Sequence, residues 1–180
     1  MKSFFIFLVS CILFIGCDRD ESLDPRPVIV SGAFVRLDII NKRLNSQQIS
    51  TTTFGGLLTT PSGKVSKYNL YVRRRDANGF VGEFKLLTTI TSFPQELKVT
   101  PQNIADALSI PVSSIVFADT FRFYGESFDT NGVRSDYSSL SQVVQTTSSM
   151  KQAYRFITDV TDNGGFVPLE YQNYDNYIAQ

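Results

Sequence analysis

Hydrophobic and polar residues alternate along much of the chain between residues 28 and 141. The two clearest runs are AFVRLDII at 33–40 and SKYNLYVRRR at 66–75. A period of two is typical of a β-strand that buries one face. The inward set that it predicts is Val35, Leu37, Ile39, Tyr68, Leu70 and Val72.

Further strands are predicted from β-branched and alternating segments, with a hairpin formed by the last two. They lie at 47–60, 82–93, 95–99, 118–129 and 133–141. Within the first of these, Gly55 and Gly56 indicate a bulge or a close approach of two backbones.

Two tetrapeptides of one type, DANG at 76–79 and DTNG at 129–132, stand between strand-like runs. Asn-Gly provides the positive φ values of tight hairpins, and Asp accepts hydrogen bonds from its own backbone. The alternative is part of a calcium loop, but neither copy has the later acidic ligand at the required spacing. We therefore interpret both as hairpin turns.

One segment changes period. In TPQNIADALSI, Thr100 can cap a helix, Pro101 suits its first position, and hydrophobic residues then share one face. Several strands with turns between them and a single short helix predict an all-β antiparallel β-sandwich. The chain lacks the alternation of strands and helices that a parallel sheet requires.

The N-terminus carries a different signal. Lys2 precedes an apolar run at 4–15 that spans only about 18 Å, less than a hydrocarbon core of about 30 Å. A short cationic and apolar segment ending in Gly16-Cys17 is typical of a secretory signal. It resembles the lipobox of bacterial lipoproteins, which implies cleavage before Cys17 and lipidation of its sulfur.

Cys11 is a rival lipidation site, and LVSC matches the lipobox better than FIGC. Cleavage there would leave only about six apolar residues and expose ILFIG at the new N-terminus. We therefore prefer Cys17, against the alternatives of an ordinary signal peptide or an uncleaved anchor. Two or more acyl chains, at about 0.8 kcal/mol per buried CH₂, would anchor the mature protein to a membrane without a spanning segment.

Acidic residues follow the cysteine directly: Asp18, Asp20 and Glu21. They are either a solvated tether or a sorting signal. They resemble the surface-export signal of Bacteroidota lipoproteins, whereas Asp after the cysteine in enteric-type bacteria would suggest inner-membrane retention. The predicted organisation is a signal at 1–16, a tether at 17–27, a sandwich at 28–141, and a polar spacer with an aromatic-rich tail at 142–180.

Composition excludes several function classes. The 180-residue chain contains no histidine and two cysteines, one expected to be removed and the other acylated. This excludes Ser-His and Cys-His catalysis and disfavours zinc. The net charge of zero gives no basic footprint for nucleic acid. Glu126 and Asp129 lie close in sequence, but we do not expect an enzyme or a cofactor.

The segments ELKVTPQNIADALSI and DTFRFYGESFDTNGVRSDYS resemble the Ig-like or fibronectin type III-like domain of SusE-type surface lipoproteins of Bacteroidota. The resemblance covers about 27–141. It implies a short helix in a connection between the two sheets, and a role as an accessory subunit beside SusC/SusD-like importers. Some such proteins bind glycans through further domains, which depend on tryptophans that this chain lacks.

Candidate contact residues are Tyr71 and Tyr124, which are predicted to point outward as a stacking platform, and Arg122, which could add a cation–π contact. The arginines at 73–75 either solvate a strand edge or receive an acidic partner.

The stretch 151–160 suggests another strand, and the remaining tail carries Tyr171, Tyr174 and Tyr177. These rings either pack on the tail's own domain or dock on a partner, where they would be hot spots.

The sequence thus predicts a non-enzymatic, lipid-anchored protein of the outer membrane, facing the cell exterior, that acts as an accessory subunit with an outer-membrane protein partner. The alternative is a small surface module that binds a glycan or another ligand.

Overall fold

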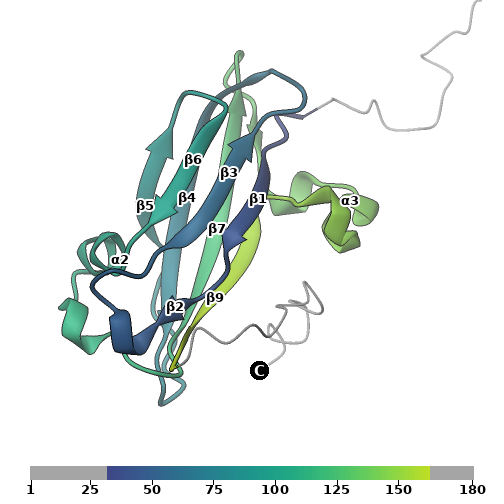
Figure 1. The fold of residues 1–180 in the computed structure, drawn as a ribbon. Helices are drawn as coiled ribbons and strands as arrows, with labels where there is room; N and C mark the ends of the chain where they lie inside the picture. The colour runs from purple at the N-terminus through teal and green to yellow at the C-terminus, as the bar shows by residue number, and fades with distance from the viewer. Residues whose placement is uncertain (1–31, 163–180) are drawn as a thin grey trace, which may run out of the picture. The chain divides into compact units, whose positions relative to one another are not determined.

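The computed structural model describes residues 32–162, which form two packed β-sheets (Figure 1). The small sheet has the order β1-β3-β6, and the large sheet has the order β2-β9-β7-β4-β5, with β8 paired to β7. The strands are β1 (Arg36–Asn41), β2 (Leu44–Asn45), β3 (Phe54–Thr59), β4 (Val65–Arg75), β5 (Lys85–Ile90), β6 (Gln95–Val99), β7 (Thr120–Asp129), β8 (Arg134–Ser135) and β9 (Arg155–Thr161). The helices are α2 (Pro101–Leu108) and α3 (Gln142–Thr146), and 3-10 turns lie at Ser46–Gln48, Val112–Ser114, Tyr137–Ser139 and Ser148–Met150.

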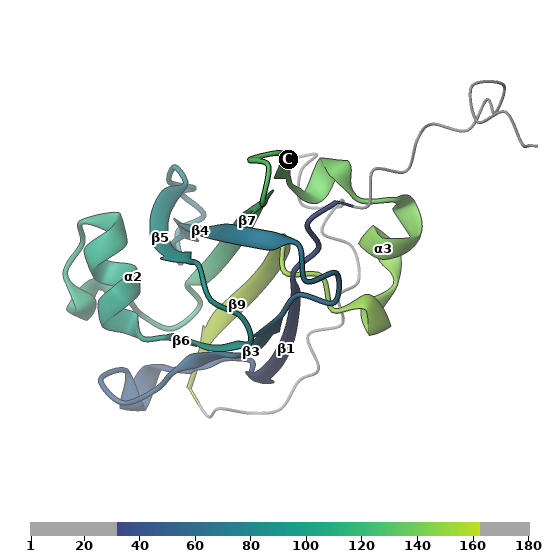
Figure 2. The same ribbon diagram turned by 90° about the horizontal axis from the view of Figure 1, so that it is seen from above.

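The predicted fold class is confirmed: the chain is an all-β sandwich, seen end-on in Figure 2 as two layers. α2 follows β6 of the small sheet and precedes β7 of the large one, so the helix lies in a sheet-to-sheet connection, as expected. Thr100 and Asn103 form a reciprocal capping box at its start. One pairing is parallel, between β2 and β9, because the chain crosses from the small sheet to the large one after β1.

The sandwich continues past residue 141, where the sequence placed its end. β9 pairs with β7 through five residue pairs, from Thr120–Asp159 to Tyr124–Arg155, and so completes the large sheet. The expected polar spacer contains α3 and a 3-10 turn instead. The predicted hairpin partner at 133–141 is shorter than expected, because Asp136 caps a 3-10 turn directly after β8.

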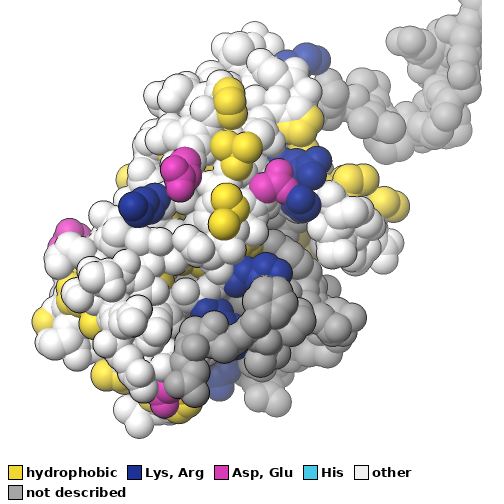
Figure 3. Space-filling model, viewed as in Figure 1, with side chains coloured by type: hydrophobic (Ala, Val, Ile, Leu, Met, Phe, Trp, Pro, Cys, Tyr) yellow, Lys and Arg dark blue, Asp and Glu magenta, His cyan; other side chains and the backbone are white. Residues whose placement is uncertain are grey.

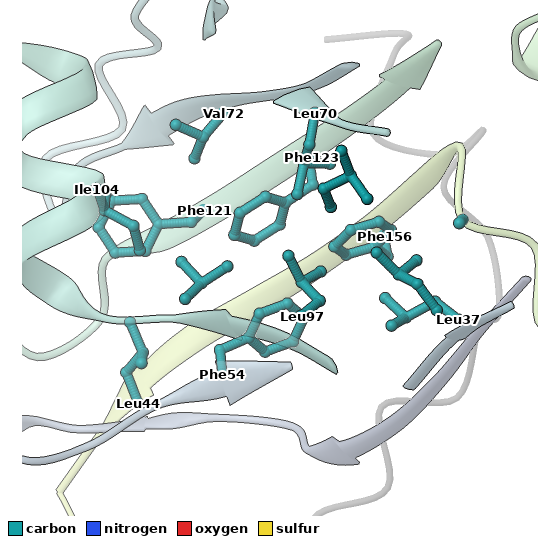
Figure 4. Close-up of a cluster of buried hydrophobic side chains, with 14 of the residues drawn as sticks. Leu37, Leu44, Phe54, Leu70, Val72, Leu97, Ile104, Phe121, Phe123 and Phe156 are labelled. Atoms are coloured by element: carbon teal, nitrogen blue, oxygen red, sulfur yellow. The ribbon is translucent and has the colours of Figure 1, made fainter. Parts of the chain in front are cut away.

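The core lies between the sheets and consists of aliphatic side chains around stacked phenylalanines (Figure 4). The Phe123 ring lies 5.1 Å from that of Phe54 and 4.9 Å from that of Phe156, so one ring comes from the small sheet and two from the large. Each buried ring contributes about 1.5–3 kcal/mol of transfer free energy. The predicted inward residues of β4 are fully buried, which confirms the alternation.

Gly55 and Gly56 allow the three strands of the small sheet to approach closely. A Cβ on Gly55 would lie 1.9 Å from the Leu97 carbonyl oxygen, and one on Gly56 would lie 1.9 Å from that of Asp38. The register shift lies opposite them in β1, between Ile39 and Asn41. Of the two alternatives expected for this Gly pair, the close backbone approach is therefore confirmed, while the extra residue of the bulge is Ile40 in the partner strand β1.

The two ends of the sandwich are named by the path of the chain. The entry end is the one at which β1 and β9 begin and at which residues 32–35 lead into the fold. At the exit end, β9 finishes at Thr161 beside β2, and the turn after β4 and the loop before β7 lie there too. Figure 1 shows β1 and β9 running toward the same end, which is the lower one in that view. The chain therefore enters at one end of the fold and leaves at the other.

A buried polar network holds the entering segment at the first of these ends. The Tyr154 hydroxyl accepts a hydrogen bond from the Val35 amide (3.0 Å) and donates one to the Ala33 carbonyl. Ser127 also donates to the Ala33 carbonyl. Burial raises the pKa of Tyr154, so the ring stays neutral. The network fixes residues 33–35 to the large sheet.

Candidate interaction surfaces

The two Asp-x-Asn-Gly turns share one geometry. Asp76 Oδ1 accepts hydrogen bonds from the Asn78 and Phe80 amides at 2.9 Å, and Asp129 Oδ1 accepts from the Asn131 and Val133 amides at 2.8 Å. Gly79 and Gly132 have φ of 88° and 81°. The hairpin interpretation is confirmed for both turns. They lie at opposite ends of the antiparallel β4–β7 pair.

Large hydrophobic side chains are exposed on the loops at the exit end. Phe80, which follows the first turn, is 72% exposed, and Phe117, in the loop before β7, is 54% exposed. Val81 and Val116 beside them are exposed as well. These four residues are called the exit-end patch below. Large apolar side chains that are exposed at one end of a domain are candidates for a contact site.

Buried charges hold the loop that carries Phe117 in place. The Arg74 guanidinium lies 2.8 Å from Asp119 Oδ2 and donates to the Ser114 carbonyl. Asp119 is fully buried, and it also accepts a hydrogen bond from the Val116 amide at 2.9 Å. The exit-end patch is thus preorganised by hydrogen bonds on both of its loops, which lowers the entropy cost of binding.

The predicted pair Tyr71–Tyr124 lies on the outer face of the large sheet, as expected from the alternation. Their ring centroids are 6.2 Å apart, and Phe84 adds a third ring 5.8 Å from Tyr124. The Arg73 guanidinium lies over Phe84, 4.6 Å from its centroid. These rings are called the tyrosine cluster.

The hydroxyl groups of the tyrosine cluster are engaged within the protein. The Tyr124 hydroxyl donates to Asp136 at 3.0 Å and accepts from Arg134 at 3.0 Å. The Tyr71 hydroxyl donates to Glu126 at 3.3 Å, and Arg134 pairs with Glu126 at 2.6 Å. The cluster therefore presents half-buried rings whose polar ends are already satisfied.

Electrostatics keep these groups in fixed protonation states. Burial, together with the hydrogen bond to Asp136, raises the pKa of Tyr124 to about 12. Burial alone would raise the pKa of Asp136, but hydrogen bonds from Ser138 and Tyr124 outweigh it and lower that pKa to about 2. Near neutral pH, Tyr124 remains protonated and Asp136 remains ionised, so neither group is placed to transfer a proton.

Arg122 lies on the same outer face of β7, two residues before Tyr124, and is only 6% exposed. Of the two alternatives for the arginines at 73–75, the one in which they solvate a strand edge is wrong for Arg74. β4 lies between β7 and β5, and Arg74 points inward to Asp119. Arginine at that position is explained by a buried carboxylate forty-five positions away in sequence.

The carboxylates that lie close in sequence serve different structures: Glu126 pairs with Arg134, and Asp129 closes a turn. Among residues 32–162, no group of three potential metal-ligating side chains is close enough to hold an ion.

The outer face of the small sheet is shown in Figure 3. Hydrophobic side chains run down its middle with charged ones on both sides. Leu57 and Ile40 are exposed there, and Lys151 pairs with Asp38 at its edge.

Several predicted site residues lie outside the described residues. They are Cys17, Asp18, Asp20, Glu21, Tyr171, Tyr174 and Tyr177. Within 32–162, none of the helices has the length and apolar character needed to cross a membrane. Lipidation, export and the place of the tail remain predictions.

Comparisons of this chain with protein-family models, with curated proteins and with solved structures found no match.

Sequence reasoning missed the exit-end patch. A signal for half of it exists, because Phe80 directly follows an Asp-x-Asn-Gly turn, where a polar residue is expected. Phe117 carries no comparable signal, since its exposure depends on how the loop before β7 is held by Arg74.

Proposed function

We propose that this protein is a non-enzymatic, lipid-anchored surface protein of the outer membrane that acts as an accessory subunit of an outer-membrane complex. Cys17 carries the lipid, Asp18, Asp20 and Glu21 direct surface export, and the sandwich contacts a protein partner. The likeness to SusE-type lipoproteins suggests an importer of the SusC/SusD type as that partner.

The observation that carries the proposal is the exit-end patch. Phe80 and Phe117 are exposed on two loops that hydrogen bonds hold rigid, at the opposite end from the point where the tether enters the fold. The described chain begins at residue 32 at the entry end, so the patch lies at the opposite end of the sandwich from the start of β1. Aromatic side chains preorganised in this way are typical hot spots of protein interfaces.

The alternative, a glycan- or ligand-binding module, is favoured by the tyrosine cluster and its polar rim. Its rings are half-buried, however, and the hydroxyls of Tyr71 and Tyr124 already bond to carboxylates. A sugar would have to bind to ring faces alone or displace these bonds.

The test is a pull-down from the native cells. The full-length protein, tagged at its C-terminus, is extracted in mild detergent, and the proteins that accompany it are identified by mass spectrometry. We expect one large outer-membrane protein at near-stoichiometric yield. Phe80→Ser together with Phe117→Ser should reduce its recovery at least tenfold.

The chain provides a matched control. Val133 follows the second turn as Phe80 follows the first, is 52% exposed, and lies at the entry end. Val133→Ser should leave recovery unchanged. An equal loss of partner recovery in both variants would show that the patch does not bind the partner. Recovery of the tagged protein alone would contradict the accessory-subunit function and favour the glycan-binding alternative.

A further inference from the structure

β6 is an edge strand of the small sheet, and only one of its two sides is paired within the described part of the chain. It pairs with β3 from Gln95 to Val99 without a register shift, and no other strand among residues 32–162 pairs with it. Figure 1 shows β6 as the outermost strand of that sheet, beside β3. Because an edge strand carries N–H and C=O groups that point away from its sheet, it is a template for one more strand.

The other sheet edges are blunted, each in a different way. Beside β1, the Leu37 amide donates to the Lys151 carbonyl at 2.8 Å, and Arg36 forms a bridge with Gln152. β5 is interrupted by a bulge at Leu87, and β2 has only two residues. Bulges, short strands and covering segments are the devices by which proteins prevent edge pairing. Among the described residues, β6 has neither a bulge nor a covering strand, and the helix that follows it, α2, packs against β5 and β4 of the large sheet.

The side chains of β6 alternate between the core and the outer face. Leu97 and Val99 are buried, so Glu96 and Lys98 lie on the outer face, and both are exposed. Neither of these two charges forms an ion pair or a side-chain hydrogen bond with another residue of 32–162. The edge therefore carries one negative and one positive side chain, two positions apart on the same face.

The strand whose charges fit this edge is a second copy of β6. A twofold axis perpendicular to the sheet makes two copies antiparallel, and it must pass through a residue because facing residues share one side of the sheet. With Leu97 on the axis, Glu96 of each copy lies opposite Lys98 of the other, with Cβ atoms about 4.5–5.5 Å apart. With Glu96 or Lys98 on the axis, that residue lies opposite its own copy, and the like charges repel. The charge pattern thus favours one partner strand in one register.

We propose that β6 is a self-association site, at which two copies of this protein pair antiparallel about Leu97. The two small sheets join into one continuous sheet, with a Glu96–Lys98 ion pair on each side of the axis. Because the two strands run in opposite directions, the exit-end patch of each copy lies toward the entry end of the other. Self-association therefore leaves the patch open to another protein.

The test uses two full-length copies with different tags, expressed together in the native cells and extracted in mild detergent. We expect each tag to recover the other copy. Lys98→Glu in both copies places glutamates opposite each other and should reduce this recovery at least fivefold, and Glu96→Lys in both copies should do the same. Lys85→Glu, on the edge strand β5, is the matched control with the same change of charge and should leave recovery unchanged.

A mixed sample distinguishes strand pairing from other causes of the loss. One copy with Lys98→Glu and one with Glu96→Lys again place opposite charges across the axis, so their co-recovery should return to the wild-type level. That return would also show that both variants fold. Recovery that neither single reversal reduces, or that stays low in the mixed sample, would overturn the proposal. An equal loss with Lys85→Glu would overturn it as well, because net charge would then control association.

The exit-end patch provides a further control. Phe80→Ser together with Phe117→Ser should leave the recovery of one copy with the other unchanged, because neither residue belongs to β6. A loss in this variant would show that a shared partner at the patch joins the two copies, and would overturn pairing through β6.

Discussion

Arg74 and Asp119 form an ion pair at the exit end of the sandwich, with 2.8 Å between guanidinium and carboxylate and with Asp119 fully buried. The pair joins β4 to the loop before β7. Separating the two residues would leave a buried charge with its full desolvation cost. The position of the loop that carries Phe117 therefore depends on Arg74 in β4.

Asp119→Ala should destabilise the protein by about 3–5 kcal/mol, since it leaves the Arg74 charge uncompensated and the Val116 amide without its acceptor. Urea unfolding followed by circular dichroism measures this free energy. Glu83→Ala removes an exposed pair with Lys85 and should change it by no more than about 1 kcal/mol. A similar small effect of Asp119→Ala would show that the pair contributes little.

Gly56→Ala should be more damaging than substitution of any turn glycine, because the new Cβ would meet the Asp38 carbonyl oxygen at 1.9 Å and push β1 away from β3. We expect a loss of more than about 3 kcal/mol, or no folded protein. Gly63→Ala is the control: it has φ of 63° but open space, so only about 1–2 kcal/mol of backbone strain is expected. Comparison of the two denaturant midpoints checks the prediction.

Tyr154→Phe should destabilise the protein by about 1–3 kcal/mol, because the Val35 amide and the Ala33 carbonyl each lose a buried partner. Hydrogen exchange of the Val35 amide should accelerate together with the fall in unfolding free energy. Tyr71→Phe removes only a half-buried bond to Glu126 and should cost less than about 1 kcal/mol. If both variants behave alike, the entering segment is held by other contacts.

The alternation of β4 could be predicted because it is a local property: Tyr68, Leu70 and Val72 are buried as the period of two requires. The two turns and the cap at Thr100 are equally local. The edge role assigned to Arg74 failed because it depends on Asp119 and on the position of β4 between two strands.

The extent of the sandwich failed for a related reason. β9 joins the sheet by pairing with β7, after an excursion of about twenty residues that breaks the hairpin pattern. The exit-end patch arises from two loops that are distant in sequence, and only the pairing of β4 with β7 brings them to one end. A pattern read along the chain does not show which loops share an end.

Asp136 should make stability depend on acid pH. Its pKa is about 2 in the folded protein against about 3.9 for an unfolded chain, so its contribution is present above about pH 4 and is lost as the pH falls toward 2. Asp136→Asn should therefore lower the unfolding free energy at pH 7 and have little effect near pH 2. Urea midpoints of both proteins between these values measure the difference. A difference that stays constant across this range would contradict the assigned pKa.

Cys17→Ser should abolish the incorporation of radiolabelled palmitate in the native cells and release the protein from the membrane fraction. The reason is physical: a single acyl chain holds a protein only marginally, and without the sulfur no chain is attached at all. Cys11→Ser should leave labelling unchanged, because cleavage there would leave too short an apolar segment for a signal. Labelling that survives Cys17→Ser and disappears with Cys11→Ser would assign the anchor to the earlier cysteine. The mature protein would then keep ILFIG near its N-terminus, and the tether before the sandwich would be six residues longer.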